Sequence, residues 1–204
     1  MLLIGLTGSI GMGKSTAANR FRTQGIAVVD ADAEVHKLYQ GAAVAPIEAA
    51  FPGTTDPAGV DRQKLAATLL KDPSGFKRLE AIVHPLVHAA EKALLKAEAD
   101  RGAAMAVLEI PLLFETGGEK RVDVTVVVSA PADMQRQRVL LRPGMTPEKF
   151  EQILSRQVPD AEKRRRADFV VDTSKTIPEA EAQVDKVIAT LAGRVGTAYA
   201  RYWL

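Results

Sequence analysis

The stretch Gly8-Ser9-Ile10-Gly11-Met12-Gly13-Lys14-Ser15 decides how the rest of this sequence is interpreted. It fits the pattern G-x-x-x-x-G-K-[ST] at every fixed position. An apolar run at residues 2–6 precedes it and a helix-compatible segment at residues 16–24 follows it. Because this pattern requires a strand before it and a helix after it, the sequence predicts a loop that binds the phosphates of a nucleoside triphosphate.

The residue types in this loop suit that chemistry. Glycines let consecutive backbone N–H groups turn toward one anion, and the following helix N-terminus adds partial positive charge. Lys14 can reach the β- and γ-phosphates, and the Ser15 hydroxyl can ligate Mg²⁺. The alternative is an ordinary glycine-rich turn with a surface lysine, which the complete pattern and its flanking segments disfavour.

Composition predicts a globular chain with one substantial domain. The 204 residues are 47% hydrophobic and 25% charged, with a net charge of +2 and no cysteine. We therefore expect no disulfide, thiol nucleophile or thiolate metal site. The chain begins with an expected strand rather than a secretion signal, and the apolar run at 103–108 is too short to span a bilayer. These features predict a cytoplasmic protein with no membrane partner.

Five short apolar segments are expected to form buried parallel strands, because they lack the alternation of half-exposed strands. Helical segments separate them, which predicts an open α/β sheet. Thr176 is the expected N-cap of the last helix, with an apolar stripe that extends to Val195. The expected strands are residues 2–6, 26–29, 105–110, 122–128 and 169–171.

Two helical insertions are expected on this sheet. The core comprises about 1–40, 103–131 and 168–204, the first insertion about 41–102, and a lid about 132–167. Residues 131–167 carry nine Lys/Arg against five acidic residues, as a lid over polyphosphate requires. For residues 163–166 the alternative is a solvated run of surface charge.

The reaction class depends on carboxylates at strand ends. The guanine-reading motif of GTPases and the signature of transporter ATPases are absent from the sequence. Asp32 follows the second strand, where a carboxylate could take the proton of an acceptor hydroxyl. The alternative for Asp32 is a helix N-cap. Glu109 ends another strand and could hold water on Mg²⁺.

Together these motifs resemble the dephospho-CoA kinase family, and the resemblance extends along the whole chain. The order and spacing of the motifs carry it, since each short motif alone is uninformative. They are Ile4 to Thr16, Val29-Asp30-Ala31-Asp32, Val60-Asp61-Arg62, Leu79 to Pro85, Ile110-Pro111-Leu112-Leu113-Phe114-Glu115, the lid residues Gln135, Arg138, Arg142, Gln157 and Lys163, and Ala167 to Asp172.

The resemblance implies a P-loop kinase fold with a three-layer core, a helical insertion that binds the CoA substrate and a helical lid. It implies phosphorylation by ATP, with Mg²⁺, of the 3′-hydroxyl of the ribose of dephospho-CoA, which gives CoA and ADP. The roles it implies for single residues are these: Gly11, Met12, Gly13, Lys14, Ser15 and Thr16 cradle the ATP phosphates, Asp32 acts on the acceptor hydroxyl, Arg138 and Arg142 reach the transferring phosphate, and His84, Pro85, Leu112, Leu113 and Glu115 form the acceptor pocket.

The sequence departs from the family pattern at three positions. Glu109 stands where the family commonly has Asp, Pro143 where it usually has a polar residue, and Thr173 where it often has Asn. For His84 the alternative role is packing at a helix end.

Two other functions remain open at this point. One is a kinase of the same fold that acts on another small metabolite or a nucleoside monophosphate, and the other is a nucleotide-dependent switch that controls a partner. RNA binding through residues 163–166 is disfavoured, because no aromatic residues interleave with the charges. ATP and dephospho-CoA are the expected partners, no nucleic acid is expected, and the sequence leaves monomer and homo-oligomer undecided.

Overall fold

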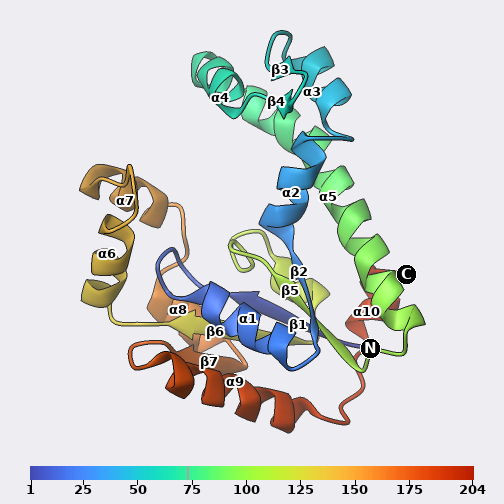
Figure 1. Ribbon diagram of the computed structural model, residues 1–204, viewed down its shortest axis with the longest axis vertical. Helices are drawn as coiled ribbons and strands as arrows, with labels where there is room; N and C mark the ends of the chain where they lie inside the picture. Colours follow the sequence, from blue (N-terminus) through green and yellow to red (C-terminus); the bar gives the residue numbers. More distant parts are fainter. Residues whose placement is uncertain (73) are drawn as a thin grey trace. The chain divides into compact units, whose positions relative to one another are not determined.

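A five-stranded sheet forms the centre of the computed structural model, which describes residues 1–72 and 74–204. The strands are β1 (Leu2–Thr7), β2 (Ala27–Asp30), β5 (Met105–Glu109), β6 (Val124–Ser129) and β7 (Phe169–Asp172). Their order is β2-β5-β1-β6-β7 (Figure 1), and the pairs β1–β5, β1–β6 and β6–β7 are parallel. The five predicted strands are thus confirmed, with ends that differ by one or two residues.

Helices lie on both sides of this sheet, which confirms the predicted α/β class. Every residue of β1 and β6 is buried, as continuous apolar strands require when both faces are covered. Helices α1 and α9 share one core with these strands, where Phe21 and Leu191 are fully buried. The helices of this part are α1 (Lys14–Thr23), α6 (Ala132–Leu140), α7 (Pro147–Leu154), α8 (Asp160–Arg166), α9 (Ile177–Leu191) and α10 (Ala198–Tyr202), with the 3₁₀ helix η1 (Gly118–Arg121).

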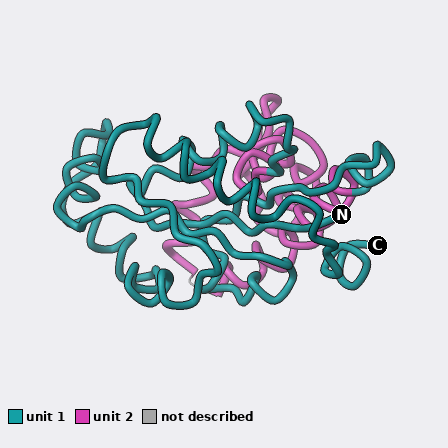
Figure 2. Tube along the Cα trace, turned by 90° about the horizontal axis from the view of Figure 1, so that it is seen from below, with its two compact units in different colours: residues 1–29, 96–204 teal, residues 30–95 magenta. Residues whose placement is uncertain are grey.

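The chain divides into two compact units, residues 1–29 with 96–204 and residues 30–95 (Figure 2). The second unit has a small core of its own, in which Ile47, Phe51 and Leu65 are buried. Its elements are α2 (Ala31–Tyr39), α3 (Val44–Ala50), β3 (Thr55–Asp56), β4 (Gly59–Val60), α4 (Arg62–Lys71) and most of α5 (Gly75–Asp100). The second unit therefore starts at α2, before the expected insertion, and the expected lid belongs to the first unit.

Two sequence expectations about helices are wrong. The apolar stripe of α9 ends at Leu191, and Val195 is 88% exposed, because the helix stops before Gly193, whose φ is a left-handed 76°. His84 lies inside the 26-residue helix α5, followed by Pro85, so it does not pack at a helix end. A helix of this length continues through the proline although Pro85 offers no N–H to it. None of the described helices combines the length and the apolar character that crossing a bilayer requires.

The N-terminus of α9 provides a test of local stability. Thr176 and Glu179 form a capping box, in which each side chain accepts from the backbone N–H of the other residue. We expect Thr176→Ala to lower the free energy of unfolding by about 1 kcal/mol, measured by urea denaturation. The matched control is Thr190→Ala, since Thr190 is an exposed threonine inside the same helix. Equal effects of the two substitutions would show that the cap contributes nothing.

Candidate active site

The loop between β1 and α1 has the backbone of an anion-binding nest. Gly11 and Gly13 have φ values of 78° and 84°, a region that side chains strongly disfavour. At Gly8 an added Cβ would lie 2.3 Å from the side chain of Val128, so the close approach of β6 also requires glycine. Helix α1 starts directly after Gly13 with no side-chain cap, which leaves its first N–H groups available to a ligand.

Backbone N–H groups at the end of this loop and at the start of α1 have no acceptor among the described residues. They include those of Gly11, Gly13, Lys14 and Ser15. The exposed Ser15 hydroxyl is likewise unpartnered within the described part of the chain. Several converging donors at the start of a helix, with a lysine beside them, form a site suited to a polyphosphate.

The Lys14 ammonium is already paired with a carboxylate. Its Nζ lies 2.5 Å from Oε1 of Glu109, and a terminal nitrogen of Arg22 lies 3.3 Å from Oε2 of the same residue. Glu109 is only 5% exposed, at the end of β5. A phosphate that recruits Lys14 must therefore compete with Glu109, and Arg22 remains as a partner for that buried carboxylate.

The two lid arginines differ in their surroundings. Arg138, on α6, donates to the Thr173 carbonyl at 2.6 Å and to the Thr173 hydroxyl at 3.2 Å. Arg142 lies just beyond α6, where its exposed side chain has no partner among the described residues. Gly144, with φ of 74°, turns the chain two residues later. The structure thus anchors Arg138 on the segment after β7 and leaves Arg142 free to reach a ligand.

Asp32 does not cap the helix that contains it. The cap of α2 is Asp30, whose carboxylate accepts from the backbone N–H groups of Asp32 and Ala33 at 3.0 and 3.1 Å. The side chain of Asp32 is exposed in the first turn and has no partner among the described residues. The N-cap alternative for Asp32 is therefore wrong, and its carboxylate is available for another role.

The remaining expected acceptor residues fall into two groups. His84 and Pro85 are exposed on α5 in the second unit. Leu112, Leu113 and Glu115 lie after β5 in the first unit, where Leu112 is 39% exposed and Leu113 is fully buried in the core.

Glu115 is engaged in an internal contact. Its Oε1 accepts from the Val158 N–H at 2.8 Å and lies 2.9 Å from Nζ of Lys163. Lys163 is 0% exposed, and the contact is an ion pair without the alignment of a hydrogen bond. The expected run of surface charge at 163–166 is therefore wrong at Lys163, which faces inward while its three arginine neighbours are exposed.

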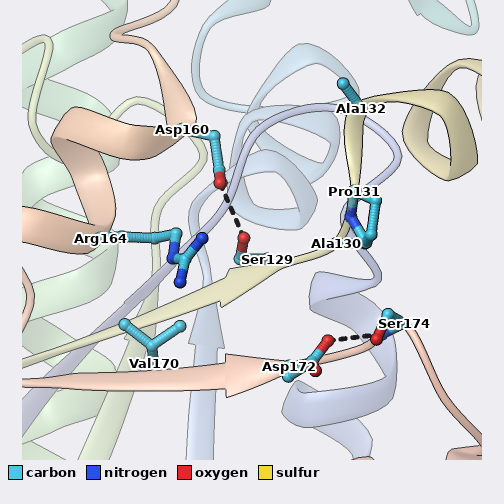
Figure 3. Close-up of a pocket in the computed structure, with 9 residues that line it drawn as sticks. All are labelled: Ser129, Ala130, Pro131, Ala132, Asp160, Arg164, Val170, Asp172 and Ser174. Atoms are coloured by element: carbon cyan, nitrogen blue, oxygen red, sulfur yellow. Dashed lines mark hydrogen bonds between the residues drawn. The ribbon is translucent and has the colours of Figure 1, made fainter.

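A cavity of about 350 Å³ lies at the ends of β6 and β7 (Figure 3). Asp160 accepts a hydrogen bond from Ser129 there at 2.7 Å, and Arg164 extends from α8 into the same space. Hydrogen bonds from Ser174 hold the pKa of Asp172 below its ordinary value. None of its lining residues belongs to the loop between β1 and α1, so the cavity is a separate feature.

Sequence reasoning missed the side chains that hold the loop in place. Gln135 donates to the Ile10 carbonyl at 2.7 Å, and Gln157 accepts from the Ile10 N–H at 3.2 Å. Thr173 donates to the Met12 carbonyl at 2.7 Å. The two glutamines appeared only as members of the lid pattern, and only the fold brings all three residues to one loop.

The buried pair of Glu115 and Lys163 gives a second stability test. We expect Glu115→Gln to lower the free energy of unfolding by about 3–5 kcal/mol, since it leaves the Lys163 charge buried without a counter-charge. Glu162→Gln is the matched control, because Glu162 pairs with the largely exposed Arg165 on the same helix and should cost less than about 1 kcal/mol. Urea denaturation of both variants distinguishes the two cases, and a small loss for Glu115→Gln would contradict the assignment.

The geometry agrees with what comparison with known proteins finds. The family model for dephospho-CoA kinase matches residues 2–179. A dephospho-CoA kinase of Rhizobium etli is 59% identical over 96% of this chain and 96% of its own length. The one from Mesorhizobium japonicum is 56% identical over 97% of this chain and 100% of its own length.

Solved structures have the same fold. The protein TT1252 from Thermus thermophilus is 37% identical, with a TM-score of 0.80 over 94% of this chain and 98% of that chain. Dephospho-CoA kinase from Campylobacter jejuni has a TM-score of 0.70 at 24% identity, over 93% of this chain and 96% of that chain. The family model and the curated relatives confirm the resemblance and the kinase class that the motifs predicted. The chain belongs to the dephospho-CoA kinase family, whose reaction is the final step of coenzyme A biosynthesis.

Proposed function

We propose that this chain transfers the γ-phosphoryl group of ATP to the 3′-hydroxyl of the ribose of dephospho-CoA, giving CoA and ADP. The observation that carries the proposal is that the N–H groups of Gly11, Gly13, Lys14 and Ser15 have no acceptor among the described residues, in a chain of this family. In this proposal the segment from Gly11 to Thr16 cradles the ATP phosphates. Lys14 exchanges Glu109 for the transferring group and stabilises the charge that develops on it.

Mg²⁺ is the proposed companion of ATP, and the Ser15 hydroxyl suits it because it is exposed and unpartnered in the described part of the chain. No group of three or more metal-binding side chains occurs among the described residues. This fits an ion held by one hydroxyl and by the phosphates, since Mg²⁺ usually keeps several waters. When bound, the ion neutralises phosphate charge. Glu109 contributes at most through water, because Lys14 and Arg22 engage its carboxylate.

We assign the remaining roles by the freedom of each side chain. Arg142 is the arginine proposed to reach the transferring phosphate, because it is exposed and unpartnered among the described residues. Arg138 is the proposed support of the nucleotide site, because it donates from α6 to the segment after β7. Asp32 is the proposed base that takes the proton of the acceptor hydroxyl.

Five residues are proposed to contact dephospho-CoA or to support the residues that do. His84 and Pro85 would contact the acceptor from α5, and Leu112 from the turn after β5. Leu113 and Glu115 would shape that turn from inside, because one is fully buried and the other is paired with Lys163.

Substitution of the loop lysine tests the donor site. We expect Lys14→Ala to lower kcat/KM by roughly 10²–10³-fold, because an electrostatic contact to the transferring phosphate is lost. A coupled assay of ADP release, run with and without dephospho-CoA, measures it. Lys186→Ala, which removes an exposed lysine of α9, should retain wild-type activity. Equal activity of the two variants would remove Lys14 from the mechanism.

The acceptor site is tested at Asp32. We expect Asp32→Asn to lower kcat by roughly 10²–10⁴-fold while the Kd for ADP stays near the wild-type value, because only proton transfer is affected. Asp30→Asn is the control, since asparagine also caps a helix and the neighbouring Asp32 is kept. Full turnover in Asp32→Asn would refute its assignment as the base.

A further inference from the structure

Two buried side chains from outside the loop hold two of its carbonyl groups. The Gln135 amide, on α6, donates to the Ile10 carbonyl, and the Thr173 hydroxyl, after β7, donates to the Met12 carbonyl, each over 2.7 Å. Gln135 is 4% exposed and Thr173 is 6% exposed. Both hydrogen bonds are therefore shielded from water, which otherwise competes for such carbonyls.

Each of these carbonyls shares a peptide plane with an N–H group of the loop. A peptide group is planar and trans, so its C=O and N–H point in opposite directions. The Ile10 carbonyl belongs to the same plane as the Gly11 N–H, and the Met12 carbonyl to the same plane as the Gly13 N–H. Whatever fixes the carbonyl on the outside of the loop also fixes the direction of the N–H on the inside.

A hydrogen bond that holds a peptide plane has the greatest effect where the backbone is flexible, as it is at glycine. The planes in question are followed by Gly11 and Gly13, which have the widest backbone freedom of all residues. Without an external contact these planes could rotate and turn a carbonyl oxygen toward the phosphates. A carbonyl oxygen there would repel the anion that the N–H attracts.

We propose that Gln135 and Thr173 are positioning residues, which aim the N–H groups of Gly11 and Gly13 at the phosphates of ATP. The inference rests on the proposed function, because it assumes that this loop is the phosphate site. It assigns a role to Thr173 at a position where this sequence departs from the common family pattern.

The hydrogen bonds around Thr173 define the direction of its proton. A nitrogen of Arg138 donates to the Thr173 oxygen at 3.2 Å and so occupies a lone pair. The proton is left for an acceptor, and the Met12 carbonyl at 2.7 Å is closer than the Ser129 carbonyl at 3.2 Å. Serine can make the same contact, whereas valine has the same shape and cannot.

Helix α6 lies in direct contact with the loop at Gly11. A Cβ at Gly11 would lie 2.5 Å from the side chain of Val139 and 3.0 Å from the Gln135 carbonyl. The loop therefore packs directly on α6, which keeps the Gln135 amide in register with the Ile10 carbonyl. Methionine at position 135 would fill a similar space without a donor.

Inorganic tripolyphosphate with Mg²⁺ is the probe, because it contacts the loop without a base or a ribose. We expect Thr173→Val and Gln135→Met each to weaken its binding about tenfold in calorimetry, the loss expected for one buried hydrogen bond. Thr173→Ser should restore binding to within about twofold. The KM for ATP should rise with the same pattern, while the KM for dephospho-CoA stays constant.

Thr125→Val is the matched control for loss of a buried hydroxyl. The Thr125 hydroxyl on β6 donates to Asp168 at 2.8 Å, away from the loop, so its loss should lower stability and leave tripolyphosphate binding unchanged. Wild-type binding in both Thr173→Val and Gln135→Met, or equal weakening in Thr125→Val, would overturn the positioning role. If Thr173→Val does not fold, Gln135→Met carries the same test. If the wild-type protein does not bind tripolyphosphate and Lys14→Ala keeps wild-type kinase activity, the proposed function is overturned instead.

Discussion

The direction of the peptide planes in the loop between β1 and α1 is the constraint on which the site depends. An anion is attracted by N–H groups and repelled by carbonyl oxygens, and each plane carries one of each at opposite ends. The carbonyls of Ser9, Ile10, Met12 and Gly13 all accept hydrogen bonds from the protein, whereas the N–H groups of Gly11 and Gly13 have no acceptor in the described part of the chain. The parallel sheet and α6 thus serve the site by bringing donors to the outside of this loop.

The charge of Lys14 also needs a partner when no nucleotide is bound, and a carboxylate supplies it. A lysine with 17% of its side chain exposed would bear a largely desolvated charge, and Glu109 balances it at the end of β5. Arg22 keeps the opposite oxygen of Glu109 occupied, so the carboxylate need not lose all its partners when Lys14 turns to a phosphate. The two oxygens of Glu109 thus contact two different cations.

Sequence alone predicted the features that depend on local pattern. The loop motif, the five strands and the Thr176 cap all follow from residues close together in the chain, and the structure contains each of them. The residue that caps α2 was missed, because Asp30 and Asp32 are both plausible caps and only the end of β2 decides between them. The roles of Gln135 and Thr173 were also missed, since their partners lie more than a hundred residues away.

Lys163 shows why a run of like charges cannot be interpreted from sequence alone. Helix α8 packs against β6, so one residue in each turn must face inward, even in a segment of four consecutive basic residues. A buried ammonium requires a counter-charge, and Glu115 supplies it from the turn after β5 while also accepting from the Val158 N–H. Such a pair adds little to stability over an apolar contact, but its geometry permits one register only. The pair therefore joins the turn after β5 to helix α8, and the Val158 N–H joins the same carboxylate to the segment that precedes α8.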